Sequence, residues 1–401
     1  MLRRRSAFDP SAGAVRGSSV EQKHPPVAHR PPLVVQRLVV QAGHALPPED
    51  QKISDSVACG LHWRTVRVIT TGVNGCDFRF RSAPVAVILL LANMTARAQV
   101  GDVQRVHDPC IIAAEGAYYL LCTGGGIAIR RSVDLLRWER IGTVFAEAPE
   151  WTRQEVPGSR GLWAPDIAFV NGRYHLYYSV STFGKNRSCI GLATNVTLDP
   201  ADPRYKWIDQ GKVVESTPGK DDFNAIDPNL VLDERDHPWL TWGSFWGGIK
   251  MCRIDPATGK PDPADRQVYA LAARPESKAI EAPFMIRRGD SYYLFVSFDL
   301  CCRGAESTYR IMVGRAGAIT GPFVDRDGRP MLRGGGTQVL AGGGRVRGPG
   351  HNAILTKGER HWLVHHFYDA DARGIATLQI RPLRWDEQGW PIAGEPIESP
   401  R

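Results

Sequence analysis

The chain has 401 residues, of which 43% are hydrophobic, and it carries a formal net charge of +8 at pH 7. Almost all of that charge lies at one end, because residues 1–98 hold 13 Lys and Arg against 6 Asp and Glu, whereas the rest of the chain holds 37 against 36. A nearly neutral body lacks the basic surface that binds a phosphate backbone, so we expect no nucleic-acid partner.

Residues 1–72 form a basic segment rich in Arg, Pro, Ala and Val. The segment shows neither the period of a strand nor that of a helix, and its composition cannot bury a core. We expect it to be either a disordered leader or the product of an over-extended reading frame.

Residues 73–98 have the three parts of a secretory signal peptide. The FRFR stretch provides a positive start, Ala83–Ala92 an apolar core, and Ala96–Ala98 a cleavage site directly before Gln99. The apolar run is too short to span a bilayer as a helix, and the alternative is an ordinary buried strand. We therefore expect a secreted or periplasmic protein that starts near Gln99 and has no membrane part in its mature form.

Cysteines occur at six positions beyond this point: Cys110, Cys122, Cys189, Cys252, Cys301 and Cys302. None stands in a CxxC pair or at the spacing of a zinc site, so a metal cluster is not expected. Export permits disulfides, and their pairing is open. We expect the adjacent Cys301 and Cys302 to find different partners, or none, rather than each other.

From Val106 onward the chain repeats one pattern, which is an apolar or aromatic run, a turn rich in Gly, Asn or Asp, and a second run. This pattern is typical of a strand, a tight turn and a second strand. Five four-stranded units of similar length predict an all-β, five-bladed β-propeller over residues 99–401, with a β-sandwich as the alternative. The five hairpins begin at Pro109, Pro165, Pro228, Pro283 and His351.

Acidic residues stand at the start of three of these hairpins: Asp108, Asp227 and Glu281. The innermost strand of every propeller blade starts at one mouth of the channel, so these side chains should converge. An Asp before Pro also caps turns, which is the alternative for each residue taken singly. Carboxylates held close together shift one another's pKa values, as acid–base cleavage of glycosides requires. Asp166 follows its proline, and we expect it to be structural.

A specific set of motifs occupies the chain from Val106 to the C-terminus: VHDP, GLWAPDIAFVNGRYHLYYSVS, FNAIDPNLVLD, TWGSFWGGIKM, IEAPF, FDLCCRGAESTYRIMVGR, GPGHNAIL and LVHHFYDA. With these motifs the chain resembles the family-43 glycoside hydrolases, and among them the endo-1,5-α-L-arabinanases. The resemblance implies a five-bladed propeller that cleaves α-1,5-linked arabinofuranose chains with inversion. FDLCCRG together with STYRIMVGR is its most discriminating part.

The resemblance also implies roles for the three carboxylates. Asp108 corresponds to the general base, Glu281 to the general acid, and Asp227 to the residue that raises the pKa of the acid and orients the sugar. These roles agree with the chemistry, because an Asp is ionised by default near neutral pH. Glu281 must keep its proton there, and charge repulsion from Asp227 can raise its pKa.

Sugar rings require flat apolar partners with polar groups at their edges. Near the carboxylates, the candidates for substrate binding are Asn224, Ala225, Ile226, Ser244, Phe245 and Trp246. The resemblance adds Gly191 from the second unit. Burial between blades is the alternative for any single aromatic residue in this set.

The resemblance further implies one calcium ion on the propeller axis, beside His366. The chain reads VHHFYD where relatives more usually have an aromatic residue before the histidine, and alignment on the following YD selects His366 rather than His365. Because calcium prefers oxygen ligands, water must complete most of such a site. The alternative is a buried histidine with a structural role.

The expected activity is hydrolysis of internal bonds in arabinan, including the arabinan side chains of pectin, by a monomeric enzyme. Two alternatives stay open. One is an exo-acting arabinofuranosidase or β-xylosidase of the same superfamily, which would share the carboxylates. The other is a propeller that binds carbohydrate without cleaving it.

Overall fold

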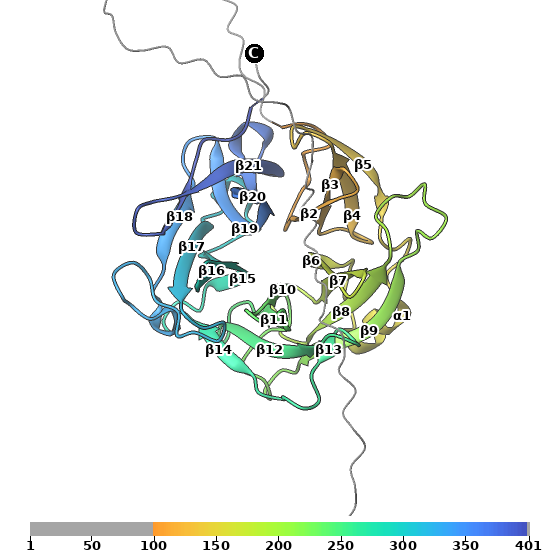
Figure 1. The fold of residues 1–401 in the computed structure, drawn as a ribbon, viewed down its shortest axis with the longest axis horizontal. Coiled ribbons are helices and arrows are strands. Elements are labelled where there is room, and N and C mark those ends of the chain that lie inside the picture. The colour runs from red at the N-terminus through yellow and green to blue at the C-terminus, as the bar shows by residue number, and fades with distance from the viewer. Residues whose placement is uncertain (1–98, 399–401) are drawn as a thin grey trace, which may run out of the picture. The chain divides into compact units, whose positions relative to one another are not determined.

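The computed structural model describes residues 99–398. The predicted leader (1–72) and signal-like segment (73–98) lie outside the described residues. Within residues 99–398 the strands form five sheets around a central axis (Figure 1). The predicted all-β, five-bladed propeller is therefore confirmed, and the sandwich alternative is wrong. In this part of the chain no helix is both long and apolar enough to cross a membrane.

In the second to fifth blades the chain enters at the innermost strand and continues outward (Figure 1). In the first blade a short strand, Val100–Gly101, comes before the innermost strand and pairs at the outer edge of the sheet. The first two blades contain β1 (Val100–Gly101), β2 (Cys110–Ala114), β3 (Ala117–Cys122), β4 (Ala128–Ser132) and β5 (Arg137–Thr143), then β6 (Trp163–Val170), β7 (Arg173–Val180), β8 (Ser188–Asn195) and β9 (Ile208–Ser216). The third contains β10 (Asn229–Leu232), β11 (Pro238–Trp242), β12 (Ile249–Asp255), β13 (Lys260–Pro261) and β14 (Tyr269–Ala272). The last two contain β15 (Ile280–Arg288), β16 (Ser291–Phe298), β17 (Arg310–Ala316) and β18 (Thr337–Ala341), then β19 (Val346–Lys357), β20 (Arg360–Asp369), β21 (Ile375–Trp385) and β22 (Pro391–Ala393).

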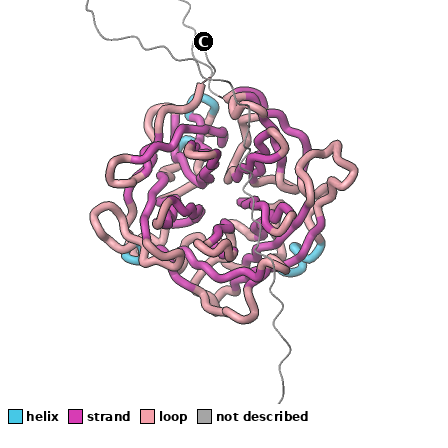
Figure 2. Tube along the Cα trace, in the orientation of Figure 1, coloured by secondary structure: helices cyan, strands magenta, loops and turns pink. Residues whose placement is uncertain are grey.

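Tight turns join the strands, and helical segments are short (Figure 2). Asn171 and Gly172, between β6 and β7, have φ values of 51° and 74°. Two left-handed residues in succession form the hairpin turn whose twist matches that of the strands. The helical segments are α1 (Glu150–Glu155), η1 (Gly304–Glu306), η2 (Met331–Arg333) and η3 (Ala370–Ala372).

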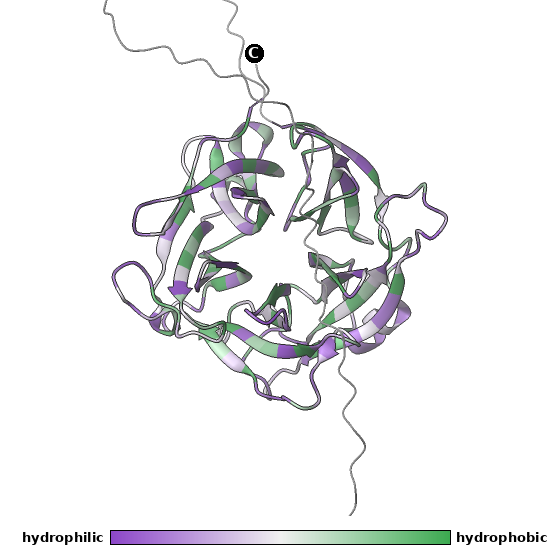
Figure 3. Ribbon diagram, in the orientation of Figure 1, coloured by the Kyte–Doolittle hydropathy of each residue, from purple (hydrophilic) through white to green (hydrophobic). Residues whose placement is uncertain are grey.

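Apolar side chains gather between the blades. The described residues form five buried clusters, one for each pair of neighbouring blades around the ring. Leu121 of the first blade and Leu176 of the second, for example, lie fully buried in the same cluster. Hydrophobic residues accordingly line the strands, while the outer loops are largely hydrophilic (Figure 3). Because blade-to-blade contact supplies the core, the axis remains available for polar side chains.

The segment Val103–Val106 closes the ring. It pairs with β21 of the fifth blade through the hydrogen bonds Leu378 N–H to Val103 O (2.8 Å) and Val106 N–H to Ala376 O (3.2 Å). The buried guanidinium of Arg130 also donates to the carbonyl oxygen of Asp102 (2.6 Å). The start of the first blade is thereby joined to the last blade.

The same turn precedes the inner strand, or interrupts it, in every blade. Its key residues are left-handed, with φ values from 39° to 59°: Asp108, Ala164, Asp227, Ala282 and His351. Such values are uncommon outside glycine, and strained backbone of this kind clusters at functional sites. The first, third and fifth blades thus present a titratable side chain at equivalent places around the axis.

The cysteines differ in part from the expectation. Cys301 and Cys302 form a disulfide with each other in the loop after β16, so the prediction that they would find different partners, or none, is wrong. This loop turns sharply, with φ of 65° at Cys302, which brings the two sulfur atoms together. In the described part of the chain the remaining cysteines are free and buried: Cys110, Cys122, Cys189 and Cys252.

Candidate active site

A cavity of about 1080 Å³ lies where the inner strands begin. Its wall includes the three predicted catalytic residues, Asp108, Asp227 and Glu281. They come from the first, third and fourth blades, and each is between 6% and 8% exposed. The propeller therefore brings together three carboxylates that lie far apart in the sequence.

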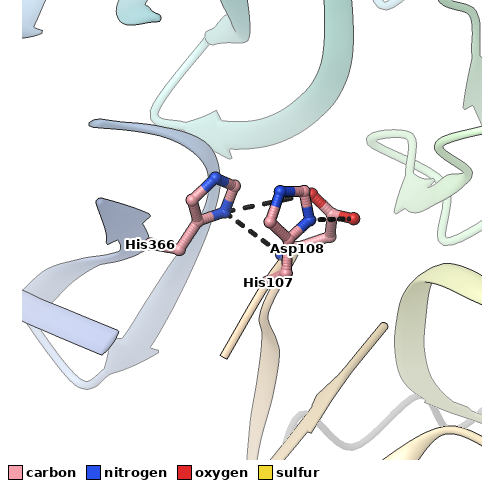
Figure 4. Close-up of side chains that lie close together, drawn as sticks. All are labelled: His107, Asp108 and His366. Atoms are coloured by element: carbon pink, nitrogen blue, oxygen red, sulfur yellow. Dashed lines mark hydrogen bonds and ion pairs between the residues drawn. The ribbon is translucent and has the colours of Figure 1, made fainter. Parts of the chain in front are cut away.

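Two imidazoles and a hydroxyl surround the carboxylate of Asp108. His107 Nδ1 lies 2.7 Å from Oδ2 (Figure 4), and the hydroxyl of Thr123 donates to the same oxygen at 2.6 Å. His351 Nδ1 lies 3.1 Å from Oδ1. Burial by itself raises the pKa of Asp108, but His107 and His351 outweigh it and hold this pKa well below its usual value. Asp108 is consequently ionised and suited to accept a proton.

Glu281 is in the opposite state. Burial, followed by the charge of Asp227, raises the pKa of Glu281 to about 8. Its Oε2 accepts a hydrogen bond from the hydroxyl of Ser244 (2.5 Å), which only partly offsets this effect. Repulsion from Asp227 therefore acts in the predicted direction, but burial contributes more. Glu281 keeps a proton near neutral pH and is suited to donate it.

Asp227 is held between the second and fourth blades. Its amide donates to Ser179 Oγ (2.9 Å), and its Oδ2 accepts from the amide of Ala282 (3.1 Å). Burial raises the pKa of Asp227 to about 6, against the lowering effect of the His351 charge. Ala282, which follows Glu281 in the chain, thus holds the Asp227 carboxylate in place, and this is the carboxylate whose charge acts on Glu281.

His351 is a site residue that the sequence reasoning did not assign. It lines the cavity, and its side chain is 13% exposed. Burial alone lowers the pKa of His351, but the carboxylates, led by Asp108, raise it to about 9. The imidazolium therefore places a positive charge among the carboxylates. The sequence does contain a signal for His351, because this residue stands at the start of the fifth repeat, at the position that Asp108 occupies in the first.

His366 is completely buried and does not line the cavity. Its Nδ1 accepts the amide hydrogen of Asp108 at 3.1 Å (Figure 4). At the other blade junctions Thr123, Ser179 and Ser297 accept the equivalent amide hydrogen through their hydroxyl oxygens. His366 is thus the counterpart of these residues in the fifth blade and holds the turn that carries Asp108.

Comparison with known proteins agrees with this arrangement. Residues 103–391 match Glycosyl hydrolases family 43. The chain belongs to glycosyl hydrolase family 43. It is therefore an enzyme, and the alternative of a propeller that only binds carbohydrate is wrong.

Individual family-43 relatives are similar over almost their whole length. An extracellular exo-α-(1→5)-L-arabinofuranosidase of Cellvibrio japonicus is 42% identical over 77% of this chain and 91% of its own. An extracellular endo-α-(1→5)-L-arabinanase of Bacillus subtilis is 42% identical over 71% of this chain and 87% of its own. The crystal structure of the family-43 endo-arabinanase of Bacillus licheniformis matches with a TM-score of 0.69 and 44% identity, over 74% of this chain and 99% of that one.

A further solved structure contains a sugar. The Cellvibrio cellulosa α-L-arabinanase complexed with arabinohexaose matches with a TM-score of 0.70 and 41% identity, over 72% of this chain and 95% of that one.

Most of the predicted substrate-binding residues of this family-43 chain line the cavity. Those that do are Asn224, Ile226, Ser244, Phe245 and Trp246. The segment from Ser244 onward spans the third and fourth blades, because Ser244 forms a bridge with Glu281 and the Phe245 amide donates to Ile280 O (2.8 Å). The aromatic pair is thereby fixed beside the acid.

Two predicted binding residues lie elsewhere. Gly191 is buried within β8, where a Cβ atom would approach the ring of Tyr178 to 2.4 Å. Ala225 is completely buried in the cluster between the second and third blades, and its amide donates to Ser216 Oγ (2.9 Å). Neither lines the cavity, and both pack within the fold. Their contact with substrate stays a prediction.

The cavity has further aromatic residues that the sequence reasoning missed. Trp163 and Phe183 of the second blade line it, and Phe183 is 79% exposed. Burial between blades cannot explain so exposed an aromatic ring. Asp166, in contrast, lies where a structural residue was expected, because its carboxylate accepts from the amide of Leu230 in the third blade (2.7 Å).

Proposed function

We propose that this chain hydrolyses α-1,5-L-arabinofuranosidic bonds of arabinan with inversion and cuts within the polymer. The observation that carries this proposal is the pair of opposite pKa shifts in one cavity, low at Asp108 and high at Glu281. An inverting glycosidase requires one ionised and one protonated carboxyl group on opposite sides of the sugar. The names of the relatives support arabinan as the substrate.

The proposed reaction has one step. Asp108 takes a proton from a water molecule while the water oxygen bonds to the anomeric carbon. Glu281 gives its proton to the leaving oxygen as the glycosidic bond breaks. Attack on the face opposite the leaving group inverts the anomeric configuration. Trp163, Phe245 and Trp246 provide the flat apolar faces against which the sugar rings lie.

Exo action is the second candidate, because relatives of both kinds are 42% identical to this chain. Product analysis on linear arabinan separates the two. Oligomers of mixed length indicate internal cleavage, whereas a single short product from the first minutes indicates exo action.

The roles of the carboxylates are tested in the same assay. Asp108→Ala and Glu281→Ala should each lower turnover by roughly 10²–10⁴-fold. Azide should restore turnover to the Asp108→Ala variant and yield a product of inverted configuration. Near-normal turnover in either variant, or no turnover of any arabinan by the wild type, contradicts the proposal.

We propose that the protein is exported and acts as a monomer on polysaccharide outside the cell. The names of relatives that are called extracellular support export. Large exposed apolar side chains in residues 99–398 are scattered over different blades, which supports a monomer: Val133, Phe183, Val196, Ile208, Val268, Leu332 and Ile392. Size-exclusion chromatography tests the oligomeric state.

We also propose a calcium ion on the axis, bound through water. Burial holds the pKa of His366 well below its usual value, so the ring is neutral. Because Nδ1 accepts from Asp108, the ring proton is on Nε2, which has no hydrogen-bond partner among the described residues. An N–H group cannot ligate a cation, so direct ligation by His366 does not fit, and the N–H group would instead donate to the oxygen of a water molecule bound to the ion.

Two measurements test the ion. Elemental analysis of the purified protein should find calcium, and a chelator should lower the melting temperature. The proposed calcium ion is contradicted if the purified protein contains no metal and its melting temperature is the same with and without chelator.

A further inference from the structure

A chain of hydrogen bonds leads from the disulfide loop to the carboxylate of Asp108. The amide of Cys302 donates to the phenol oxygen of Tyr368 (2.7 Å). That oxygen lies 2.8 Å from His107 Nε2, and His107 Nδ1 lies 2.7 Å from Asp108 Oδ2. The chain joins three separate elements, which are the loop after β16, strand β20 and the turn before β2.

Donor and acceptor chemistry sets the direction of this chain. An amide N–H can only donate, so the oxygen of Tyr368 accepts from Cys302. The phenol hydrogen then points to His107 Nε2 at 2.8 Å, which is a much closer acceptor than Cys302 Sγ at 3.9 Å. The neutral ring of His107 then carries its hydrogen on Nδ1 and donates it to Asp108. If the ring is instead protonated, Nε2–H donates to the phenol oxygen. In both states the Nδ1–H group of His107 points to Oδ2.

Ring packing supports the same orientation. The ring of His107 stacks on that of His366, with centroids 4.2 Å apart and planes at 24°. Tyr368 meets His366 edge-on at 5.2 Å and 81°. His366 is completely buried and Tyr368 is 4% exposed. The imidazole of His107 therefore has a fixed plane as well as fixed partners.

The two oxygens of Asp108 are not equivalent as a result. Oδ2 receives hydrogen bonds from both His107 and Thr123, which occupy its two lone pairs. Oδ1 has one close partner, His351, at 3.1 Å. A lone pair able to accept a proton from water is thus left on Oδ1 alone.

We propose that His107 and Tyr368 are positioning residues that occupy Oδ2 of Asp108 and so make Oδ1 the atom that takes the proton from water. This inference rests on the proposed role of Asp108 as the base. The residues touch neither sugar nor water in this role. Their contribution is to the orientation of the carboxylate, so it acts on kcat and not on KM.

The variants for the test are His107→Leu, His107→Asn and Tyr368→Phe. The Asn side chain places an N–H donor near the position of Nδ1, whereas Leu has none. The matched control is Tyr292→Phe, which removes a hydroxyl that donates to Glu234 (2.8 Å), away from the cavity. Melting temperatures of all variants show whether each one folds.

On linear arabinan, His107→Leu should lower kcat by about 100-fold and Tyr368→Phe by about tenfold, with KM nearly constant, because small displacements of a reacting group cost this much. The kcat of His107→Asn should be about tenfold higher than that of His107→Leu. The control should match the wild type. Unchanged kcat in His107→Leu and Tyr368→Phe, a rise in KM alone, or no recovery with Asn overturns the proposal.

A second readout does not depend on turnover. In protein labelled with nitrogen-15 at histidine, the Nδ1–H of His107 should give a downfield imidazole resonance. This resonance should be absent in His107→Leu, shift in Tyr368→Phe and stay in place in Tyr292→Phe. If the wild type cleaves no arabinan, the proposed function fails but this test still decides the hydrogen bond. Absence of the resonance in the folded wild type overturns the positioning role.

Discussion

At the scale of the residue, the surroundings of each carboxyl group decide its part in the chemistry. Asp108 is buried beside two imidazoles, which keep it ionised. Glu281 is equally buried, but the charge with the largest effect on its pKa is that of another carboxylate, Asp227, so burial and repulsion both raise this pKa. Two acids in one cavity thereby reach the different protonation states that a base and an acid need.

The alkaline limb of the pH–rate profile should reveal the influence of Asp227. Glu281 works while protonated, so activity is lost as pH rises through its pKa of about 8. Asp227→Asn removes the repulsion and keeps much of the shape, and the limb should therefore move to lower pH. Since burial is the larger cause, the limb should not move as far as the usual pKa of a glutamate.

The control for this prediction is Asp290→Asn in the exposed turn between β15 and β16, which should leave the profile unchanged. Coupled groups titrate as a set, so the displacement of the limb is the relevant quantity. An unmoved limb with measurable activity would leave Asp227 with a role in sugar binding only.

At the scale of the element, the junctions between blades support the catalytic turns. Each left-handed turn needs an acceptor for its amide hydrogen, and the preceding blade supplies it in every case. In the first, second, third and fifth blades the acceptor is a side chain from the second strand of the preceding blade, or from directly after that strand. At the remaining turn Asp227 accepts from Ala282, because the residue opposite, Gly243, has no side chain. The position of each catalytic group therefore depends on the blade before it.

Ser297→Ala tests such a junction. Ser297 is completely buried and accepts the amide hydrogen of His351 at 2.8 Å. Loss of the Ser297 hydroxyl leaves the buried amide of His351 without an acceptor, which should lower the free energy of unfolding by about 1–3 kcal/mol. The melting temperature should fall by about 2 °C or more, and kcat should fall because His351 moves away from Asp108.

Ser291→Ala is the matched control in the same strand, since the Ser291 hydroxyl has no hydrogen bond among the described residues. Calorimetry and kinetics on both variants make the comparison. Equal melting temperatures and equal kcat in the two would show that the junction does not support His351.

At the scale of the whole molecule, closure of the ring depends on a short segment ahead of the first blade. A chain that starts at His107 lacks Val103–Val106 and also the carbonyl groups that accept from Arg130. Hydrogen bonds to a charged group contribute about 1.5–3 kcal/mol each, so unfolding free energy should drop by at least about 3 kcal/mol. Urea denaturation against a chain that starts at Gln99 measures the difference, and equal midpoints would exclude a closing role.

The start of the exported protein is a second prediction at this scale. If residues 73–98 direct export, the secreted chain should begin at or near Gln99. Removal of residues 1–72 should then change neither export nor activity. N-terminal sequencing of secreted protein is the measurement, and a mature chain that begins near Met1 would contradict the prediction.

The sequence by itself determined the strands, the turns and the number of blades, because alternation of apolar residues and left-handed turn residues are local properties. It also located Asp108, Asp227 and Glu281, since equivalent positions of a repeat must meet at the axis. Phe245 and Trp246 followed from their nearness to Asp227 in the chain.

Only the tertiary structure decided which neighbours these groups acquire. His351 reaches Asp108 across the junction where the last blade meets the first, a contact between residues more than two hundred positions apart. Gly191, which only the resemblance placed at the site, lies buried within a strand against Tyr178, and Ala225, although next to Asn224 in the chain, packs between two blades. The protonation states of Asp108 and Glu281 depend on burial by several blades at once, and no local pattern of residues contains that information.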